Sequence, residues 1–491
     1  MRKLSSYFST NDVLMPSVTN WFRNLYMVLL ALTISFTAVA NISQEPQKSD
    51  EELNTKAEQN PVPQTLHTIA NAVSATRIEQ DIRSLISFGT RHTLSETQSD
   101  TRGIGAARRW IKNEFEKISA QCGGCIEVFY QSEVISGEKR IPNATEVVSV
   151  IAIQKGTSDP NRFVLMSGDI DSRVSDVMNF TSDSPGANDN ASGVAGTLEA
   201  ARVLSKYQFH GSIVYAALAG EEQGLFGGRI LAEYAKANNW QLKAVLNNDM
   251  IGNIEGVNGV INNTSARIFA EGTRQTETEQ EARSRRFTGG EVDSPSRNLA
   301  RYIDKMADQY IENLDTMVVY RLDRFGRGGH HRPFNDLGYP GVRIMETNEN
   351  YTRQHQDLRT EKGVIYGDTI EGVNFKYAAK LTALNAVSLA AMSWAPKPPT
   401  GVSIKGAVEP STTLSWKALP EAENPQLAGY KIYWRLTDAP QWQYSRDVGN
   451  VTEFTLENVV IDNYFFGVAS VSKEGFESPV VYPGAAGAFG E

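Results

Sequence analysis

Carboxylates gather in four short polar segments, each of which follows an apolar run of the chain. The segments hold Asp169 and Asp171, Asp189, the neighbours Glu221 and Glu222, and Asp249. Two carboxylates at positions i and i+2 of an extended chain face the same way, so both can serve one centre. Several uncompensated carboxylates in one crevice repel each other unless cations bind between them. Together the four segments therefore predict a metal site.

Imidazole is scarce, because the chain has only 6 histidines. His330 and His331 are adjacent among glycines in a predicted loop, which is poor material for a core, and this favours a metal ligand there. A polar segment further along the chain contains Tyr351 and His355. We expect those two residues to contact the substrate or to support the metal ligands.

The elements that must position these residues alternate between strand and helix. Short apolar runs predict strands at residues 147–153, 163–166, 212–218, 242–246 and 317–320. Helical periodicity covers residues 69–86, 106–118, 193–207, 225–236, 299–311 and 375–392. This alternation predicts an α/β fold with a mixed, largely parallel central sheet and helices on both faces. Open α/β sheets place their sites at the carboxyl ends of strands, where the acidic segments fall.

The order of the motifs resembles a known family over roughly residues 70–395. Gly-x-x-Asp-Ser is followed by Gly-Ala-x-Asp-Asn-x-Ser-Gly, Gly-Glu-Glu-x-Gly, Asn-Asp-Met-Ile-Gly and His-x-Pro-Phe. This order resembles the co-catalytic zinc aminopeptidases of the bacterial leucyl aminopeptidase type, in metallopeptidase clan MH. The resemblance implies a zinc exopeptidase-like fold and two Zn²⁺ ions. It also implies an enzyme that hydrolyses the N-terminal bond of peptide substrates through a metal-bridged water.

The resemblance also implies a role for each matching residue. Asp189 would bridge the two zinc ions. Glu222 and His331 would complete one metal site, and Asp169 and Asp249 would complete the other. The two remaining carboxylates would be catalytic, with Glu221 as the general base and Asp171 orienting the ligand at position 169.

Two positions depart from the family pattern. The family usually has His-x-Asp where this chain has Asp169-x-Asp171, and Ser-Asp-His where this chain has Gly329-His330-His331. Zinc accepts either His or Asp, so Asp169 stays a candidate ligand. A site of three carboxylates shifts the metal preference towards Mn²⁺ or another divalent ion. His330 is then expected either to compensate or hydrogen-bond Asp169, or to be a solvated loop residue.

Other functions remain alternatives. One is a different hydrolase of the same clan, a carboxypeptidase or a single-zinc glutaminyl cyclase, and another is an inactive relative that acts as a binding or adhesion protein. The retained Glu221 and ligand set favour an enzyme. The 48 Lys+Arg against 57 Asp+Glu, a net charge of −9, argue against nucleic acid as a partner. The sequence carries no signal for the oligomeric state.

The N-terminus predicts export. Residues 1–40 combine basic residues, an apolar run over residues 25–39 and the small-x-small sequence Ala38-Val39-Ala40, which is typical of a signal peptide. The protein would then be periplasmic or extracellular, with no stable membrane insertion once the signal is cleaved. An uncleaved membrane anchor is the alternative. Residues 41–65 are polar and predict a linker.

The remaining chain divides into two predicted domains. Residues 66–395 are expected to form the peptidase domain, with a surface insertion at residues 267–297 that could border the active site. A Pro-rich linker at residues 396–402 precedes about seven short alternating segments in residues 403–491. Trp416 and the Tyr430-x-Ile432-x-Trp434 strand resemble a fibronectin type III module, a β-sandwich.

Cys122 and Cys125 are the only cysteines, and they stand in a Cys-Gly-Gly-Cys sequence. An exported protein meets an oxidising compartment, in which such a pair forms a disulfide. A redox-active pair of the thioredoxin type would need a helix to start after the motif. Here the motif leads into a strand-like run, residues 126–129, so we expect a structural disulfide at a helix-to-strand turn.

Overall fold

The computed structural model describes residues 63–489. The predicted signal peptide and nearly all of the predicted linker, residues 41–65, lie outside this range. The helices are α2 (Gln64–Ala72), α3 (Ala75–Ile86), α4 (Gly103–Gln121), α5 (Gly193–Leu204), α6 (Glu221–Gly224), α7 (Phe226–Ala237), α8 (Glu279–Thr288), α9 (Pro295–Tyr310), α10 (His331–Asp336) and α11 (Phe375–Trp394), with a π-helical turn η1 (Ala187–Ser192).

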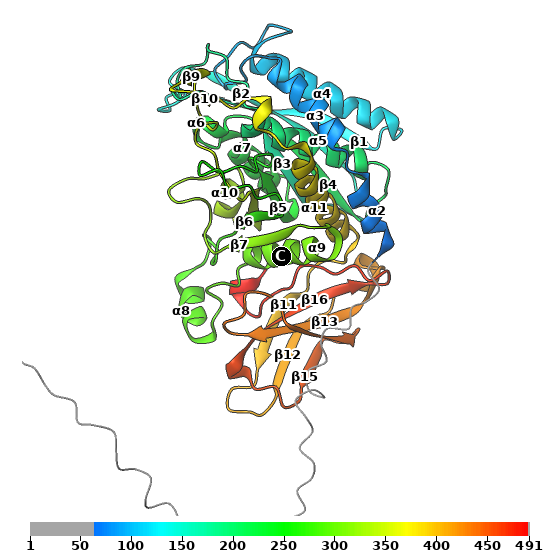
Figure 1. Cartoon of the computed structure of the whole chain (residues 1–491). Helices are drawn as coiled ribbons and strands as arrows, with labels where there is room; N and C mark the ends of the chain where they lie inside the picture. The colour runs from blue at the N-terminus through cyan, green and yellow to red at the C-terminus, as the bar shows by residue number, and fades with distance from the viewer. Residues whose placement is uncertain (1–62, 490–491) are drawn as a thin grey trace, which may run out of the picture. The chain divides into compact units, whose positions relative to one another are not determined.

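Sixteen strands complete the described fold (Figure 1). Those of the central sheet are β1 (Ile126–Ile135), β2 (Thr145–Gln154), β3 (Asp159–Asp169), β4 (Gly211–Leu218), β5 (Gln241–Asn248), β6 (Ser265–Phe269), β7 (Asp315–Val319) and β8 (Gly341–Glu346). The others are β9 (Arg359–Glu361), β10 (Val364–Tyr366), β11 (Thr400–Lys405), β12 (Thr412–Lys417), β13 (Leu427–Leu436), β14 (Tyr444–Gly449), β15 (Glu453–Leu456) and β16 (Tyr464–Ser472).

The eight-stranded sheet has the order β1-β2-β4-β3-β5-β8-β6-β7. Its middle is parallel, because β3 pairs in parallel with β4 and with β5, and β5 pairs in parallel with β8. Antiparallel pairs join β1 to β2, β2 to β4, and β6 to β8. The predicted mixed, largely parallel sheet is therefore confirmed.

The strand β4 shows why helices cover both faces of the sheet. All eight of its residues are buried, as expected for a strand that is sandwiched between two layers. Val214, Ala216 and Leu218 join a core with α7 and Phe334 of α10. The alternate residues Ile213, Tyr215 and Ala217 join the larger core with α5 and α11. The period of two along one strand thus supplies both cores.

The helical run predicted over residues 69–86 is two helices. Val73 and Ser74 are extended, and the Ser74 hydroxyl accepts a hydrogen bond from the backbone N–H of Arg77 at 3.3 Å. The Ser74 N–H donates to the buried carboxylate of Glu199 at 2.7 Å. Serine is a favoured N-cap, so a new helix starts at this position.

The segment predicted as a surface insertion, residues 267–297, is partly structural. Its first residues belong to β6 in the central sheet, and its last belong to α9. Only α8 and its flanks lie on the surface, and α8 has no buried residue. Gly289, at the end of α8, lies against Phe465 of β16. The segment therefore borders the C-terminal sheets.

The C-terminal region consists of two antiparallel sheets of three strands each, β11-β12-β15 and β14-β13-β16. They enclose a core that includes Trp416, Trp434 and Phe466. Six named strands form these sheets, against the seven expected. The likeness to a fibronectin type III module stays a prediction.

A buried ion cluster joins this region to α9. Asp293 accepts a hydrogen bond from Arg301 at 2.8 Å and two from Arg435 of β13 at 2.9 Å. All three residues are at most 1% exposed. Lys305 of α9 also pairs with Glu477 at 2.7 Å. Removal of one partner from a buried ion pair is strongly destabilising, so these contacts hold the two regions together.

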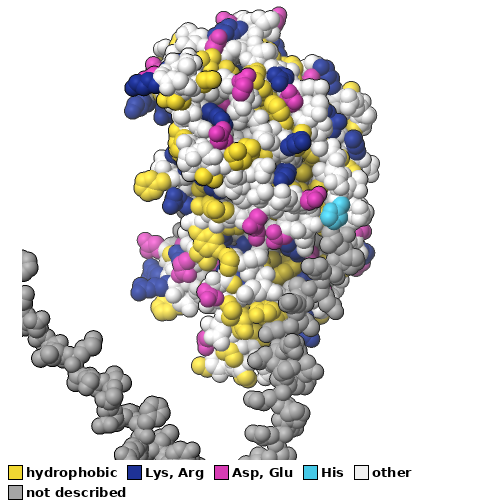
Figure 2. Space-filling view, in the orientation of Figure 1, with side chains coloured by type: hydrophobic (Ala, Val, Ile, Leu, Met, Phe, Trp, Pro, Cys, Tyr) yellow, Lys and Arg dark blue, Asp and Glu magenta, His cyan; other side chains and the backbone are white. Residues whose placement is uncertain are grey.

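The surface carries side chains of both signs. On the face shown in Figure 2, Lys and Arg side chains are interspersed with Asp and Glu. Within residues 63–489, no helix combines the length and the apolar character that a membrane crossing requires.

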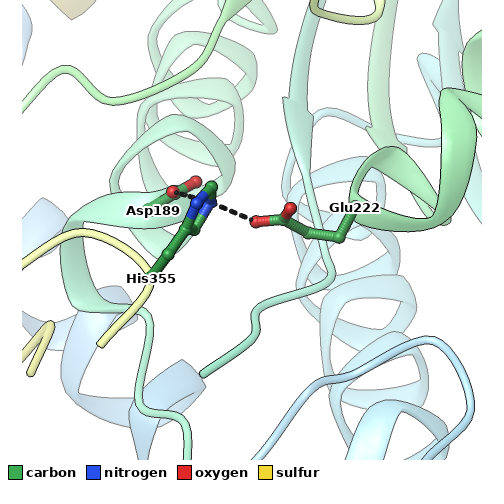
Figure 3. Close-up of side chains that lie close together, drawn as sticks. All are labelled: Asp189, Glu222 and His355. Carbon is green, nitrogen blue, oxygen red and sulfur yellow. Dashed lines mark ion pairs between the residues drawn. The ribbon is translucent and has the colours of Figure 1, made fainter. Parts of the chain in front are cut away.

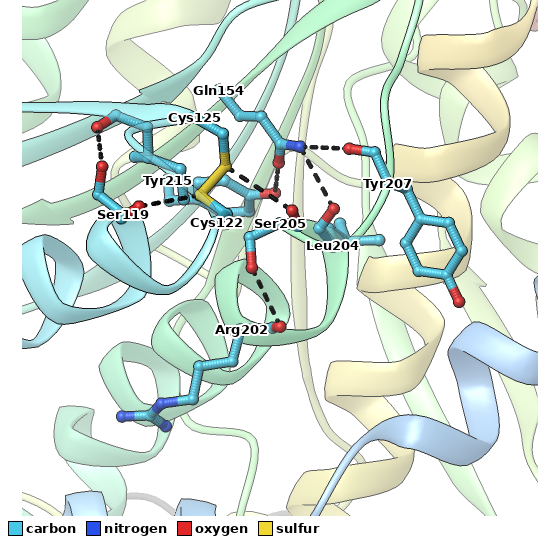
Figure 4. Close-up of a disulfide and its surroundings, with 10 residues drawn as sticks. Ser119, Cys122, Cys125, Gln154, Arg202, Leu204, Ser205, Tyr207 and Tyr215 are labelled. Atoms are coloured by element: carbon cyan, nitrogen blue, oxygen red, sulfur yellow. Dashed lines mark hydrogen bonds between the residues drawn. A yellow bond between two sulfur atoms is a disulfide. The ribbon is translucent and has the colours of Figure 1, made fainter.

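The two cysteines form the expected disulfide between the end of α4 and the start of β1 (Figure 4). Both side chains pack at the edge of the larger core. Close by, the Ser119 hydroxyl donates to the carbonyl of Ile126 at 2.6 Å, so the helix end and the strand start are joined twice. The location is structural and lies away from the acidic strand ends.

We expect the double substitution of Cys122→Ser and Cys125→Ser to leave turnover near the wild-type value. The closed loop is so short that its entropic stabilisation is only about 2 kcal/mol. A modest fall in melting temperature with unchanged kcat, measured on the same sample, is the expected result. A large loss of turnover in a folded double variant would show that the pair has a catalytic role.

Candidate metal centre

The parallel strands bring the predicted acidic segments to one edge of the sheet. β3 ends at Asp169, whose Cα partner on β4 is Leu218, three residues before Glu221. β5 ends one residue before Asp249. Asp169, Asp171, Glu222 and Asp249 are all at most 6% exposed. The register of the strands therefore gathers these carboxylates in the protein interior.

Asp189 is presented by the turn η1. Asp368 accepts hydrogen bonds from the backbone N–H groups of Asn188 and Asp189, the latter at 2.6 Å. The turn is entered through Gly186, which has a φ of 53°. A Cβ at Gly186 would lie 2.5 Å from the carbonyl oxygen of Asp189, so glycine is required there.

Three side chains converge on one point. His355 Nε2 lies 2.8 Å from Glu222 Oε1 and 3.0 Å from Asp189 Oδ2 (Figure 3). Of the His, Cys, Asp and Glu residues that the structure describes, these three form the one group whose possible ligand atoms all lie within 4.8 Å of one another. Zinc binds imidazole nitrogen and carboxylate oxygen, and catalytic sites offer three protein ligands and an open position. The residues fit one zinc ion.

His355, rather than the predicted His331, is the imidazole of this cluster. His331 begins α10, and its Nε2 lies 2.8 Å from the Leu322 carbonyl and 3.8 Å from Asp323. Its ring is directed towards that loop. Tyr351, which we expected near the substrate, is 55% exposed.

Arg173 orients Glu222 and contacts His355, and it was not predicted from the sequence. Its Nε donates to Glu222 Oε2 at 2.7 Å, and its Nη2 lies 2.6 Å from His355 Nδ1. Gln354 also donates to Asp189 Oδ2, at 3.3 Å. The signal for Arg173 was its place directly after the Asp169-x-Asp171-Ser172 sequence, at the end of a strand.

Asp171 positions the two glutamates. Its carboxylate accepts the backbone N–H of Glu221 at 3.2 Å and that of Glu222 at 3.0 Å, at the start of α6. The hydroxyl of Thr93 also donates to it, at 3.2 Å. Asp171 therefore fixes the Glu221–Glu222 turn, whereas the ligand at position 169, which it was expected to orient, is held by other residues.

The site strongly favours positive charge. Burial raises the pKa of Asp169, Asp171 and Asp249 to about 7 each. Burial, followed by the charges of Glu222 and Asp249, raises the pKa of Glu221 well above its ordinary value. A bound cation counteracts both effects, so ionised carboxylates and a metal ion stabilise each other here.

The second predicted metal site has a different environment. Asp169 Oδ1 lies 2.5 Å from His330 Nδ1, and Asp169 Oδ2 accepts a hydrogen bond from Asn190 at 2.6 Å. Asp249 Oδ2 lies 2.6 Å from the guanidinium of Arg343. Both oxygens of Asp169 and one oxygen of Asp249 therefore face protein donors, whereas Asp249 Oδ1 is buried without a hydrogen-bond partner.

A cavity of about 440 Å³ is lined by Thr93, which donates to Asp171, and by the apolar side chains of Leu94, Met178 and Phe180.

A carboxylate and imidazole cluster at the carboxyl ends of a mixed α/β sheet, with a further glutamate, Glu221, beside it, defines a metal-dependent hydrolase. Comparison with known proteins agrees. The model of peptidase family M28 matches residues 149–364. A probable zinc metalloprotease of Pyrenophora teres f. teres is 40% identical over 97% of this chain and 99% of that protein.

Another probable zinc metalloprotease, from Leptosphaeria maculans, is 43% identical over 85% of this chain and 96% of its own length. The chain belongs to peptidase family M28 and is a zinc metalloprotease of that family. The crystal structure of LapA from Legionella shares its fold, with a TM-score of 0.50 and 19% identity over 68% of this chain and 78% of LapA.

Proposed function

We propose that the protein is an exported, zinc-dependent aminopeptidase. The observation that carries this proposal is the convergence of Asp189, Glu222 and His355 on one point, with Glu221 directly before Glu222 in the first turn of α6. A bound zinc ion would polarise the scissile carbonyl and make water acidic enough to attack near neutral pH.

The residues of the chain would do the rest of the chemistry. Glu221 accepts the proton of the attacking water and delivers it to the leaving amine. Asp171 holds the backbone of Glu221 and Glu222, and so fixes where the base stands. Arg173 keeps Glu222 in its orientation.

The surplus of carboxylates favours the amino end of a peptide. An α-amino group is a cation, and Asp189, Glu221 and Glu222 bring three carboxyl groups to the centre against the single imidazole of His355. A carboxypeptidase would need an unpaired cation for the terminal carboxylate. The arginines closest to the cluster are already engaged, since Arg173 pairs with Glu222 and Arg324 pairs with Glu349.

Export is proposed from the first 40 residues, whose basic start, apolar run and Ala38-Val39-Ala40 sequence are typical of a signal peptide. The disulfide of Cys122 and Cys125 is compatible with an oxidising compartment. Detection of the protein in the culture medium or periplasm, with its N-terminus after Ala40, would test this part.

A second candidate function is glutaminyl cyclisation. It is favoured by the finding that the described residues offer a single three-ligand group, which is enough for a single-zinc cyclase. Incubation with peptides that begin with glutamine separates the two functions. A cyclase releases ammonia and leaves every peptide bond intact, whereas an aminopeptidase releases the terminal amino acid.

Chelation is expected to abolish peptidase activity, and added zinc is expected to restore it, because the proposed reaction depends on the zinc ion that the three ligands hold. The assay uses aminoacyl chromogenic substrates together with peptides whose amino group is acetylated. Free substrates should be cleaved and acetylated ones should not. Equal rates for both kinds would contradict the aminopeptidase proposal and favour an endopeptidase.

A further inference from the structure

The guanidinium of Arg343 is buried beside Asp249, where the positive charge of a second metal ion would be expected. Arg343 is in the middle of β8, opposite Asn247 of β5 and two residues from Asp249 in that register. It is fully buried. Its Nη2 lies 2.6 Å from Asp249 Oδ2, and its Nη1 donates to both oxygens of Asp323 at 3.1 and 3.2 Å.

These contacts fix Arg343 firmly. A third acceptor, the carbonyl of Gly328, lies 2.9 Å from its Nη1. Burial lowers the pKa of an arginine, but the adjacent charges of Asp249 and Asp323 outweigh this and raise the pKa of Arg343. A second guanidinium, that of Arg324, lies 4.0 Å from Asp249. Both guanidinium groups thus approach the same oxygen, Asp249 Oδ2, and Asp249 Oδ1 has no hydrogen-bond partner.

The partner carboxylate at the other side is engaged as well. His330 Nδ1 lies 2.5 Å from Asp169 Oδ1. The side-chain amide of Asn190 donates a hydrogen bond to Asp169 Oδ2 at 2.6 Å. His330 and Asp169 are both at most 2% exposed, so this contact is shielded from water. Relative to the family pattern, Asp169 stands where a histidine is usual and His330 stands where an aspartate is usual. In this chain the two residues are paired with each other.

A divalent cation at Asp169, Asp189 and Asp249 would have to displace a donor from Asp169, and at the unpartnered Oδ1 of Asp249 it would stand beside a fixed guanidinium. Like charges at such distances repel strongly in a buried site. Displacement of Arg343 from Asp249 would also leave part of a buried charge without its partner, which is strongly destabilising. The oxygens of these three aspartates do not form a group within 4.8 Å among the described residues.

We propose that this chain binds one zinc ion, at Asp189, Glu222 and His355, and that Arg343 and His330 replace the second ion by holding Asp249 and Asp169. The proposal rests on the proposed function for the identity of the first ion. It assigns Arg343 a positioning role, since its contacts in the site are with Asp249 and Asp323.

The test is a count of bound zinc on the full chain. The protein is stripped with a chelator, titrated with zinc in a calorimeter and analysed for metal after gel filtration. One zinc per chain is the expected result. Two per chain would overturn the inference and leave the proposed function standing, and none would overturn both. One zinc without peptidase activity would support the inference and contradict the proposed function.

Two matched variants sharpen this count. Asp249→Asn and Asp323→Asn each remove one charge beside Arg343, and only Asp249 belongs to the predicted second site. Both variants should still bind one zinc per chain. A loss of zinc confined to Asp249→Asn, with a circular dichroism spectrum like that of the wild type, would show that Asp249 is a ligand and would overturn the inference.

Discussion

His355→Ala is expected to lose zinc and nearly all activity. The ring supplies the only nitrogen donor of the cluster and lies within 3.0 Å of both carboxylates. Loss of a residue that only supports a ligand typically costs 10–100-fold in metal affinity. Loss of the ligand itself should therefore weaken zinc binding by more than about 100-fold. Calorimetric titration with zinc and the peptidase assay check this on one preparation.

The matched control is His331→Ala. His331 is fully buried, and its Nε2 lies against the carbonyl of Leu322. We expect this variant to keep its zinc and to lose some thermal stability, because a buried contact is removed. The reverse outcome, in which His331→Ala loses the ion and His355→Ala keeps it, would show that the sequence-based assignment was right.

Glu221→Gln is expected to retain zinc while kcat falls by roughly 100- to 10,000-fold, the usual range for loss of a general acid–base group. Glutamine keeps the shape of the side chain and the backbone N–H that donates to Asp171. The three ligands of the cluster are not changed. Steady-state kinetics and metal analysis together separate the loss of a base from the loss of an ion.

Glu222→Gln provides the comparison, because it changes the neighbouring residue in the same way. Glu222 Oε1 lies in the cluster, so this variant should lose affinity for zinc and recover part of its activity at high zinc concentration. If Glu221→Gln turned over substrate at the wild-type rate, Glu221 would not be the base.

The sequence predicted the acidic edge of the sheet because apolar strand runs and the carboxylates that follow them are both visible along the chain. The strands β3, β4 and β5 each contain a short, buried, mainly apolar run, and carboxylates follow each run within a few residues. Parallel strands bring their carboxyl ends to one edge, so the order along the chain already implied proximity in space. No long-range information was needed for this part.

The imidazole ligand could not be predicted in this way. His355 lies in a loop between β8 and β9 that has no periodicity, and it has a φ of 53°, which no pattern signals. Arg343 was missed because β8 is short and carries a charge in its middle, which disguises a buried strand as a polar segment. Its partners Asp249 and Asp323 are far away along the sequence, so the compensating pair is visible only in three dimensions.

The ion cluster around Asp293 has a consequence for how the molecule comes apart. One carboxylate is shared by a guanidinium from α9 and another from β13, so unfolding of either region would remove a partner from this buried ion cluster. The catalytic fold and the C-terminal sheets, which the sequence separates with a proline-rich stretch, should therefore melt in a single cooperative transition. The two regions that differ in sequence pattern would then unfold together.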